Sequence, residues 1–238
     1  MPSKIIGKNA VINAAESKRK FFEVFVSYQN LNSCESVLKY AESNNVKIHI
    51  LRRNEMDVKF PKEKHQGIVA YVEEYKYANI EEILEGNENP FIIILDGLED
   101  PQNLGAILRT ADATNVDCVI IPKNRSVALN STVAKVSTGA IEYVPVAQVT
   151  NLTQTIRRIK ELGVWVVGTD SDAEMDYTEI DGNMRIAIVV GSEGKGISRL
   201  VKEQCDYLVK IPMNGKVNSL NASVSAALMM YEVYKGRH

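Results

Sequence analysis

The chain has 238 residues and a formal net charge of −2, and 45% of its residues are hydrophobic against 24% charged. This composition is typical of a globular protein and is enough for one large domain or two modest ones. The longest apolar runs, at 91–95 and 186–190, are far too short to cross a bilayer, and the first ten residues lack the apolar core of a signal peptide. We therefore expect a cytoplasmic protein with no membrane partner.

Cysteine and histidine usage gives no indication of a metal site. Cys34, Cys118 and Cys205 stand far apart without a CxxC spacing, so we expect reduced thiols that fill core space. The three histidines are equally scattered and form no metal-ligand pattern. The sequence therefore predicts a protein without a bound metal.

The charge is unevenly distributed along the chain. Residues 1–76 carry 13 Lys and Arg against 9 Asp and Glu, whereas residues 77–238 carry 15 against 21. A basic first third is typical of a domain that touches phosphates, although ordinary surface lysine is an equally good explanation of the count alone. The basic residues cluster at 18–20, 52–53 and 59–64.

Residues 1–76 predict a small α/β domain. Strand-like runs lie at 22–26, 46–50 and 67–72, and a helical stretch at 33–43 separates the first two. The segment 77–90 carries four glutamates and ends in Gly-Asn-Glu-Asn-Pro, which indicates a linker.

Residues 91–238 predict a second α/β domain in which apolar strands alternate with helices. Strand-like runs lie at 91–95, 117–121, 142–146, 164–168, 186–190 and 207–211. Helical stretches lie at 101–115, 128–139, 150–162, 197–204 and 220–235. Continuous apolar strands that alternate with helices imply a parallel sheet covered on both faces.

Three loops that follow these strands are rich in Gly, Asn, Ser and charged residues, after the runs at 91–95, 186–190 and 207–211. Because ligands bind beyond the carboxyl ends of parallel strands, the three loops predict one composite site. The stretch 211–222, IPMNGKVNSLNA, places small polar residues between a strand and a long apolar helix. Such residues indicate either a plain loop or a binding site.

Motif spacing argues against two common nucleotide-binding folds. A nicotinamide enzyme needs GxGxxG after its first strand and an acidic residue at the end of the second, but here the second strand ends in Ile-Pro-Lys at 121–123. The Gly-Lys-Gly at 194–196 lacks the upstream glycine and the Ser or Thr of a P-loop.

The helix expected after the first of these loops has a clear start. Asp100 followed by Pro101 is an N-cap with proline at the first helical position. A buried stripe follows at Leu104, Ile107, Leu108 and Ala111. Arg109 lies off that stripe and shares a face with Gly105, which leaves room for a close approach. By position alone, Arg109 is most often read as a solvated surface charge.

Three ordered motifs carry a resemblance to a known family: DPQNLGAILRTADA, IVVGSEGKGI and IPMNGKVNSLNASVSAAL. They resemble the motifs of the SpoU (TrmH-type) RNA ribose 2′-O-methyltransferases, in order and at family spacing. GKNAV at 7–11 and HQGIVA at 65–70 resemble the L30e-like substrate-binding domain of the same family. The arrangement is closest to the branch that methylates a guanosine of large-subunit (23S) ribosomal RNA.

The resemblance implies an α/β domain with a C-terminal trefoil knot, which sequence rules alone would not propose. It implies S-adenosylmethionine as the cofactor, held by the 211–222 turn, the loop after 186–190 and the loop after 164–168. The cofactor-binding residues expected by similarity are Thr169, Gly191, Ile211, Met213 and Leu220.

The implied reaction is attack of a ribose 2′-hydroxyl on a sulfonium methyl group, with no metal. By similarity, Arg109 activates the hydroxyl, and electrostatic stabilisation is favoured over proton abstraction because a protein arginine stays protonated. Asn103, Glu193, Ser219 and Asn221 would orient Arg109, the ribose and the loops. The weaker alternative for Glu193 is a solvated surface acid. For Ser219 and Asn221 the alternative is turn or cap chemistry, which can hold together with a role in the site.

The final helix is apolar nearly all round, so it is either wholly buried or faces another subunit. By similarity we expect a homodimer whose active site is completed across the interface. The expected RNA partner is 23S ribosomal RNA or a ribosomal precursor particle. Two alternatives stay open: a transfer RNA guanosine 2′-O-methyltransferase of the same fold, and a catalytically silent RNA-binding protein that kept the knot.

Overall fold

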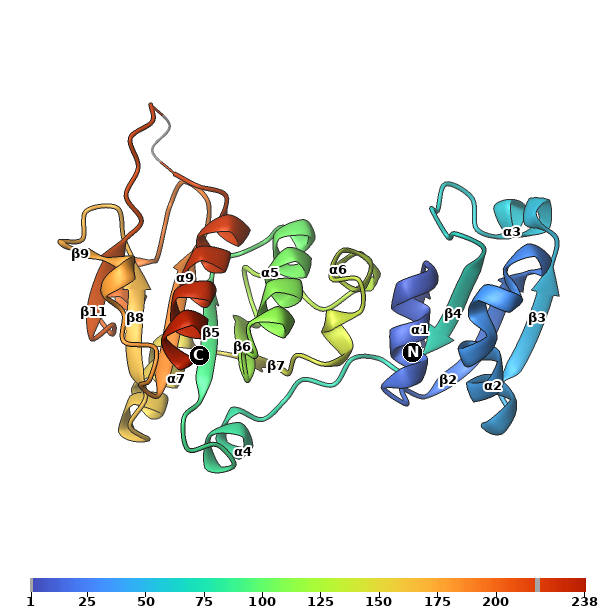
Figure 1. Ribbon diagram of the computed structural model, residues 1–238, viewed down its shortest axis with the longest axis horizontal. Helices are drawn as coiled ribbons and strands as arrows, with labels where there is room; N and C mark the ends of the chain where they lie inside the picture. The colour runs from blue at the N-terminus through green and yellow to red at the C-terminus, as the bar shows by residue number, and fades with distance from the viewer. Residues whose placement is uncertain (1, 217–218) are drawn as a thin grey trace. The chain divides into compact units, whose positions relative to one another are not determined.

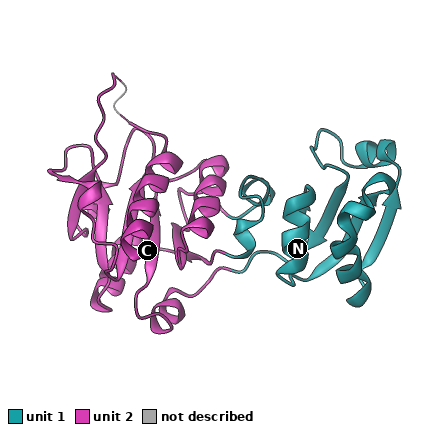
Figure 2. Ribbon diagram, in the orientation of Figure 1, with its two compact units in different colours: residues 1–76, 129–143 teal, residues 77–128, 144–238 magenta. Residues whose placement is uncertain are grey.

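The structure is a computed structural model that describes residues 2–216 and 219–238. The chain divides into two compact units, one formed by residues up to 76 together with 129–143, the other by 77–128 and 144–238 (Figure 2). The chain therefore passes between unit 1 and unit 2 three times. The segment 129–143, which in the sequence lies inside the predicted second domain, belongs to unit 1.

Unit 1 is built on a four-stranded sheet with the strand order β1-β4-β2-β3 (Figure 1). Strand β4 runs antiparallel to β1 and β2, whereas β2 and β3 are parallel. The strands are β1 (Ser3–Ile6), β2 (Phe21–Ser27), β3 (Lys47–Leu51) and β4 (Ile68–Val72). The helices are α1 (Lys8–Glu16), α2 (Glu35–Ser43), α3 (Arg53–Lys59) and α6 (Ser131–Val136).

The structure confirms the strands predicted at 22–26, 46–50 and 67–72 and the helix predicted at 33–43. Strand β1 and helices α1 and α3 were not predicted.

The directions of β2, β3 and β4 bring several loops of unit 1 together. Since β4 is antiparallel to β2, the carboxyl ends of β2 and β3 and the amino end of β4 meet at one edge of the sheet. The loops that lead to α3 and to Ile68 therefore lie at that edge.

Unit 2 holds a seven-stranded parallel sheet with the order β7-β6-β5-β10-β8-β11-β9. The strands are β5 (Phe91–Asp96), β6 (Cys118–Pro122), β7 (Val146–Val149), β8 (Trp165–Thr169), β9 (Met175–Asp176), β10 (Ile186–Gly191) and β11 (Tyr207–Lys210). The helices are α4 (Ile80–Glu85), α5 (Pro101–Ala113), α7 (Leu152–Glu161), α8 (Arg199–Lys202) and α9 (Ala222–Arg237). The parallel α/β architecture is confirmed.

Helices cover both faces of this sheet. Apolar side chains of α4, α7 and α8 pack on one face, where they contact residues of β5, β6, β8 and β10. On the other face α5 and α9 pack against each other, and α9 contacts β10 (Figure 1). The central strand β10 is buried along its whole length, as expected for a parallel strand covered on both sides. The trefoil knot stays a prediction from the resemblance.

One predicted strand is wrong. Of the run at 142–146 only Val146 lies in a strand, because the chain first forms a 3₁₀ turn (η3, Ala140–Glu142) and β7 begins at Val146. Two local causes explain the difference. Gly139, at φ 103°, enters the turn, and Pro145 has no N–H to donate to a ladder. The Glu142 carboxylate also accepts bonds from Arg19 and Tyr75 within unit 1.

No helix of the described chain is long and apolar enough to span a bilayer. Within the same residues, no cluster of three or more His, Cys, Asp or Glu side chains could hold a metal ion. Burial raises the pKa of the Cys118 thiol to about 12 and that of Cys205 to about 11. Both thiols are therefore protonated at neutral pH.

Candidate active site

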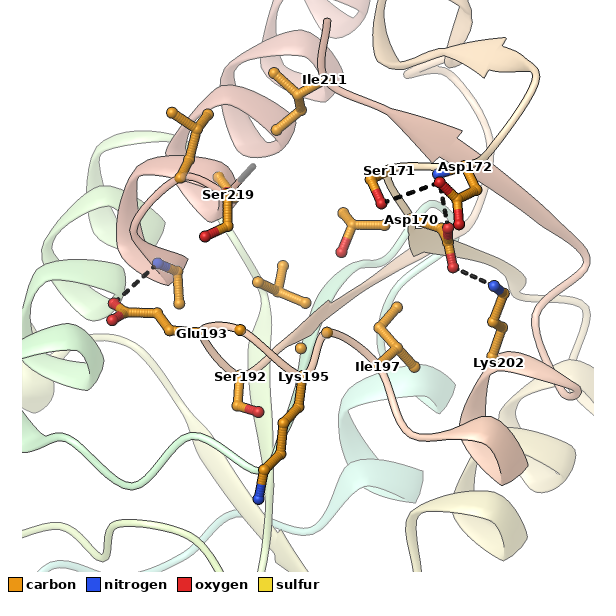
Figure 3. A pocket seen from close by; sticks show the side chains of 18 of the residues that line it. Asp170, Ser171, Asp172, Ser192, Glu193, Lys195, Ile197, Lys202, Ile211 and Ser219 are labelled. Carbon is orange, nitrogen blue, oxygen red and sulfur yellow. Dashed lines mark hydrogen bonds and ion pairs between the residues drawn. The ribbon is translucent and has the colours of Figure 1, made fainter. Parts of the chain in front are cut away.

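A cavity of about 530 Å³ opens at the carboxyl edge of the unit 2 sheet (Figure 3). Segments that follow β8, β10 and β11, together with the start of α9, line this cavity. The five residues expected to bind the cofactor all lie on its wall: Thr169, Gly191, Ile211, Met213 and Leu220. Glu193 and Ser219 line it as well. Two of the three loops predicted to form one site, those after 186–190 and 207–211, thus line a single cavity together with the segment after β8. The loop after 91–95 contributes no lining residue among those described, and its Asn103 is linked to the cavity only through Glu193. Val217 and Asn218 of the last loop lie outside the described residues.

The loop at 191–197 forms one wall through a close crossing of its own backbone. Ser192 and Gly196 exchange two backbone hydrogen bonds, of 2.9 and 3.2 Å. A Cβ on Gly191 would lie 2.0 Å from the carbonyl carbon of Gly196 and 2.3 Å from the amide nitrogen of Ile197. Only glycine fits there, so Gly191 lets the loop fold back tightly beside the cavity.

The opposite wall comes from the segment after β11. Ile211 and Ser219 lie on this wall (Figure 3), and Leu220 and Met213 add apolar surface. Met213 is 37% exposed. The walls thus combine apolar side chains with backbone polar groups, as small-molecule sites commonly do.

An ion pair on the cavity rim was not predicted from the sequence. Lys202 pairs with Asp170, which directly follows β8 (Figure 3). Burial acts to raise the pKa of Asp170, but hydrogen bonds from Lys202 and the Asp172 amide, with the Lys202 charge, lower it overall. Asp170 is therefore a carboxylate at neutral pH. The position of Asp170 just beyond a strand end was the available sequence signal.

Asn103, Glu193 and Asn221 form a hydrogen-bonded network that joins the three motifs. Asn103 Nδ2 donates to Glu193 Oε1 at 3.0 Å, and Asn221 Nδ2 donates to the same oxygen at 2.6 Å and to Asn103 Oδ1 at 2.9 Å. The backbone N–H of Ala222 approaches Glu193 Oε1 at 3.4 Å. Glu193 is therefore held by donors from α5 and from the start of α9, and is not a free surface acid.

Asn221 is also the N-cap of α9. Its Oδ1 accepts from the N–H groups of Ser223, at 2.9 Å, and Val224, at 3.4 Å. The structure confirms the capping interpretation of this position and places the same side chain in the network with Glu193 and Asn103. A role of Asn221 in the reaction, which is compatible with capping, stays a prediction.

Arg109 lies apart from this network. It is exposed on α5, six residues beyond Asn103, or roughly 9 Å along the helix axis at the usual rise per residue. Among the described residues it forms no ion pair, and it does not line the cavity. Of the five expected catalytic residues, the structure therefore joins Asn103, Glu193 and Asn221, places Ser219 on the cavity wall, and leaves Arg109 exposed on α5.

Comparison with known proteins identifies the class. The family model described as the SpoU rRNA Methylase family matches residues 90–231, and the model described as RNA 2′-O ribose methyltransferase substrate binding matches residues 4–78. The chain belongs to the SpoU rRNA methylase family, and is an RNA 2′-O-ribose methyltransferase by class.

Three individual proteins illustrate the relationship. A putative TrmH family tRNA/rRNA methyltransferase, YacO of Bacillus subtilis (strain 168), is 50% identical over 98% of this chain and 96% of its own. The structure of the AdoMet-bound rRNA methyltransferase from Sinorhizobium meliloti has a TM-score of 0.83 at 23% identity, covering 98% of this chain and 87% of its own. The A. aeolicus TrmH/SpoU tRNA modifying enzyme has a TM-score of 0.58 at 28% identity, covering 66% and 80%.

Proposed function

We propose that the protein methylates the ribose 2′-hydroxyl of a guanosine in large-subunit (23S) ribosomal RNA, as free RNA or in a ribosomal precursor particle in the cytoplasm. The observation that carries this proposal is the pairing, in one chain, of the unit 2 cavity with a separate basic unit that matches a substrate-binding model. The rRNA methyltransferase of similar fold covers nearly the whole chain, whereas the tRNA modifying enzyme covers 66% of it. This difference favours the ribosomal substrate over transfer RNA.

The cavity residues fit S-adenosylmethionine. The missing Cβ of Gly191 lets the 191–197 loop fold back tightly beside the cavity, and Ile211 and Leu220 offer the apolar contact that an adenine ring needs. When bound, this cofactor supplies an electrophilic methyl group. The hydroxyl of Thr169 donates to the carbonyl of Val189 at 3.2 Å. Thr169 therefore stabilises the wall of the cavity and takes no part in the methyl transfer itself.

The chain's own residues then position and activate the ribose. The exposed guanidinium of Arg109 keeps its proton and stabilises negative charge that develops on the 2′-oxygen or on the adjacent phosphate. The network of Asn103, Glu193 and Asn221 fixes the first turn of α5 and the start of α9 relative to the cavity. Ser219, on the cavity wall, lies beside this network in sequence and orients the last loop.

We also propose that the active unit is a homodimer formed through α9. Val224 and Tyr231 are 46% and 52% exposed, and with the half-buried Leu228 they form one apolar face at helical spacing. An exposed apolar helix face of this kind is typical of a subunit interface. Completion of the site by the partner subunit would explain why Arg109 stands clear of the network within one chain.

Mapping ribose methylation in a strain that lacks the protein tests the substrate. We expect one guanosine of 23S ribosomal RNA to lose its 2′-O-methyl group, and purified protein to restore it with S-adenosylmethionine. Loss confined to transfer RNA would replace the proposed substrate with the alternative one. A protein that binds RNA but neither binds the cofactor by calorimetry nor transfers methyl groups would be the catalytically silent alternative.

A further inference from the structure

Unit 1 carries a second cleft, of about 880 Å³, where β2 and β3 end. Its walls include Tyr28 in the turn after β2 and Ile50 on the edge strand β3, and Arg52 and Arg53 at the start of α3. Tyr28 is 72% exposed and Ile50 is 55% exposed. An open aromatic ring beside an exposed aliphatic side chain and two arginines is an unusual combination for a surface without a ligand.

The turn that carries Tyr28 is rigidly held. The Ser27 hydroxyl donates to Asn30 Oδ1 at 2.6 Å, and the Ser27 amide donates to the Gly67 carbonyl at 2.8 Å. A Cβ on Gly67 would lie 2.1 Å from Asn30 Oδ1, so only glycine lets the loop before β4 approach this turn. The aromatic ring therefore stands on a fixed base although it is itself exposed.

Helix α3 is tied to the same base through His65, which is 1% exposed. The Gly67 N–H donates to His65 Nδ1 at 3.0 Å, which leaves the proton on Nε2, and Nε2 then donates to Asp57 Oδ1 at 2.9 Å. The tyrosine turn and the arginine-bearing helix are thus joined through Gly67, His65 and Asp57. The two sides of the cleft are pre-organised, which reduces the entropic cost of binding.

The two arginines of the cleft are available to a phosphate, whereas its two carboxylates are engaged by neighbouring groups. Glu55 is used locally, since its carboxylate accepts the Arg52 backbone N–H at 2.6 Å. Asp57 binds His65 and approaches Arg53 Nε at 3.6 Å, which leaves the terminal nitrogens of Arg53 available. Among the described residues, the Arg52 guanidinium has no acidic partner. Exposed Lys62 and Lys64 lie in the loop before β4, at the same edge of the sheet.

The basic cluster at 18–20 is of a different kind. Arg19 is buried, with its side chain 8% exposed and paired to Glu142 at 2.9 Å, and its guanidinium lies 3.5 Å from the Tyr75 ring centroid. Arg19 therefore stabilises the fold of unit 1 through contacts with Glu142 and Tyr75 and is not available to bind RNA. Lys20, over the Phe22 ring, lies at the amino end of β2, roughly 20 Å from Tyr28 by the length of the strand.

We propose that the cleft of Tyr28, Ile50, Arg52 and Arg53 binds one unpaired nucleotide of the RNA substrate, with its base stacked on Tyr28 and its phosphate held by the arginines. This inference rests on the proposed function for the identity of the RNA. A duplex hides the faces of its bases, whereas an unpaired base can insert between Tyr28 and Ile50. Arginine forks match phosphate oxygens, and aromatic stacking accepts any base.

Binding of full-length protein to 23S ribosomal RNA from the deletion strain, measured across a salt series, tests the proposal. We expect Tyr28→Leu to weaken binding roughly 10-fold or more, the usual effect of removing one base–aromatic stack, with an unchanged salt dependence. Tyr28→Phe keeps the ring and should bind like the wild type. Arg52→Gln should flatten the slope of log affinity against log salt by about 0.7, the value for one phosphate contact on a single strand.

Matched controls lie on the same unit. Phe22→Leu and Lys20→Gln remove an aromatic ring and a basic charge at the opposite end of β2, and both should leave affinity and salt slope unchanged. Equal losses in these controls would mean that diffuse charge, not the cleft, binds the RNA. Ultraviolet crosslinking of the wild-type complex should also join Tyr28 to a nucleotide that is unpaired in the free RNA, and a crosslink only to duplex nucleotides would overturn the proposal.

Methyl transfer and RNA binding separate an error in the cleft assignment from an error in the proposed function. Methyl transfer at saturating RNA and affinity for S-adenosylmethionine should both be unchanged in Tyr28→Leu, because the cleft and the cofactor cavity lie in different units. If Tyr28→Leu binds RNA as the wild type does while the wild type methylates it, the cleft assignment is wrong and the function stands. If RNA binds through Tyr28 but no ribosomal RNA is methylated, the cleft assignment stands and the proposed methylation of ribosomal RNA is wrong. Wild-type protein that binds another protein through Tyr28, and not RNA, would overturn the cleft proposal.

Discussion

Replacing Gly191 with alanine tests whether the backbone crossing at 191–197 shapes the cofactor cavity. The new methyl group would lie 2.0 Å from the Gly196 carbonyl carbon, 2.2 Å from its oxygen and 2.3 Å from the Ile197 nitrogen. All three are backbone atoms, so no side-chain rotation relieves the overlap and the loop itself must move. Overpacking of this kind typically costs about 1–3 kcal/mol.

We expect the displaced loop to lose cofactor affinity by roughly 5- to 150-fold, since each 1.4 kcal/mol corresponds to a factor of ten. Calorimetric titration with S-adenosylmethionine measures the loss of affinity, and urea unfolding measures the loss of stability. Ser192→Ala is the matched control, because it adds no atom and keeps both backbone hydrogen bonds to Gly196. A Gly191→Ala protein with wild-type affinity and wild-type stability would show that the crossing does not shape the site.

Three further predictions concern catalysis, the C-terminus and the domains. Arg109→Ala should abolish methyl transfer while cofactor affinity stays within about twofold by calorimetry, because Arg109 does not line the cavity; retained turnover would refute its role. Arg237→Met should lower the free energy of unfolding by about 2 kcal/mol, since its guanidinium binds the carbonyls of residues 89, 182 and 184 at 2.9–3.1 Å. Lys235→Met, at a side chain 74% exposed, should change it by less than about 0.5 kcal/mol in the same urea titration. A fragment that begins at Asn89 should bind S-adenosylmethionine but lose most RNA affinity, with early protease cleavage within 129–143; full RNA affinity would show that unit 1 does not recognise RNA.

The sheet of unit 2 was predictable because its strands are continuous apolar runs. Strands β5 and β10 are buried along nearly their whole length, and apolar runs of five or six residues bounded by turn signals are typical of such strands. Short elements were less predictable. Strand β1 has 4 residues, and its pairing with β4 depends on a contact with a segment more than sixty positions away. The run at 142–146 failed because tertiary contacts of Glu142 outweighed the local preference of its valines.

The cavity of unit 2 was predictable in outline for a topological reason. Parallel strands place their following loops at one edge, so residues after β10 and β11 had to meet there, and the family resemblance added the loop after β8. The ion pair between Asp170 and Lys202 was not predictable, because it joins two elements whose distance the sequence does not define. The Tyr28 cleft escaped prediction for the same reason, since exposure of a tyrosine after a strand depends on what the rest of the unit covers.

Asn221 shows why site and fold are not separable at the start of α9. Its Oδ1 accepts from the first turn of the helix, and its Nδ2 donates to Glu193 and to Asn103. Aspartate would cap the helix equally well but would bring a second carboxylate against Glu193 and provide no donor. Serine would cap the helix but is too short to reach both partners. An asparagine amide meets both requirements at once, so the geometry that begins the last helix also fixes Glu193 beside the cavity.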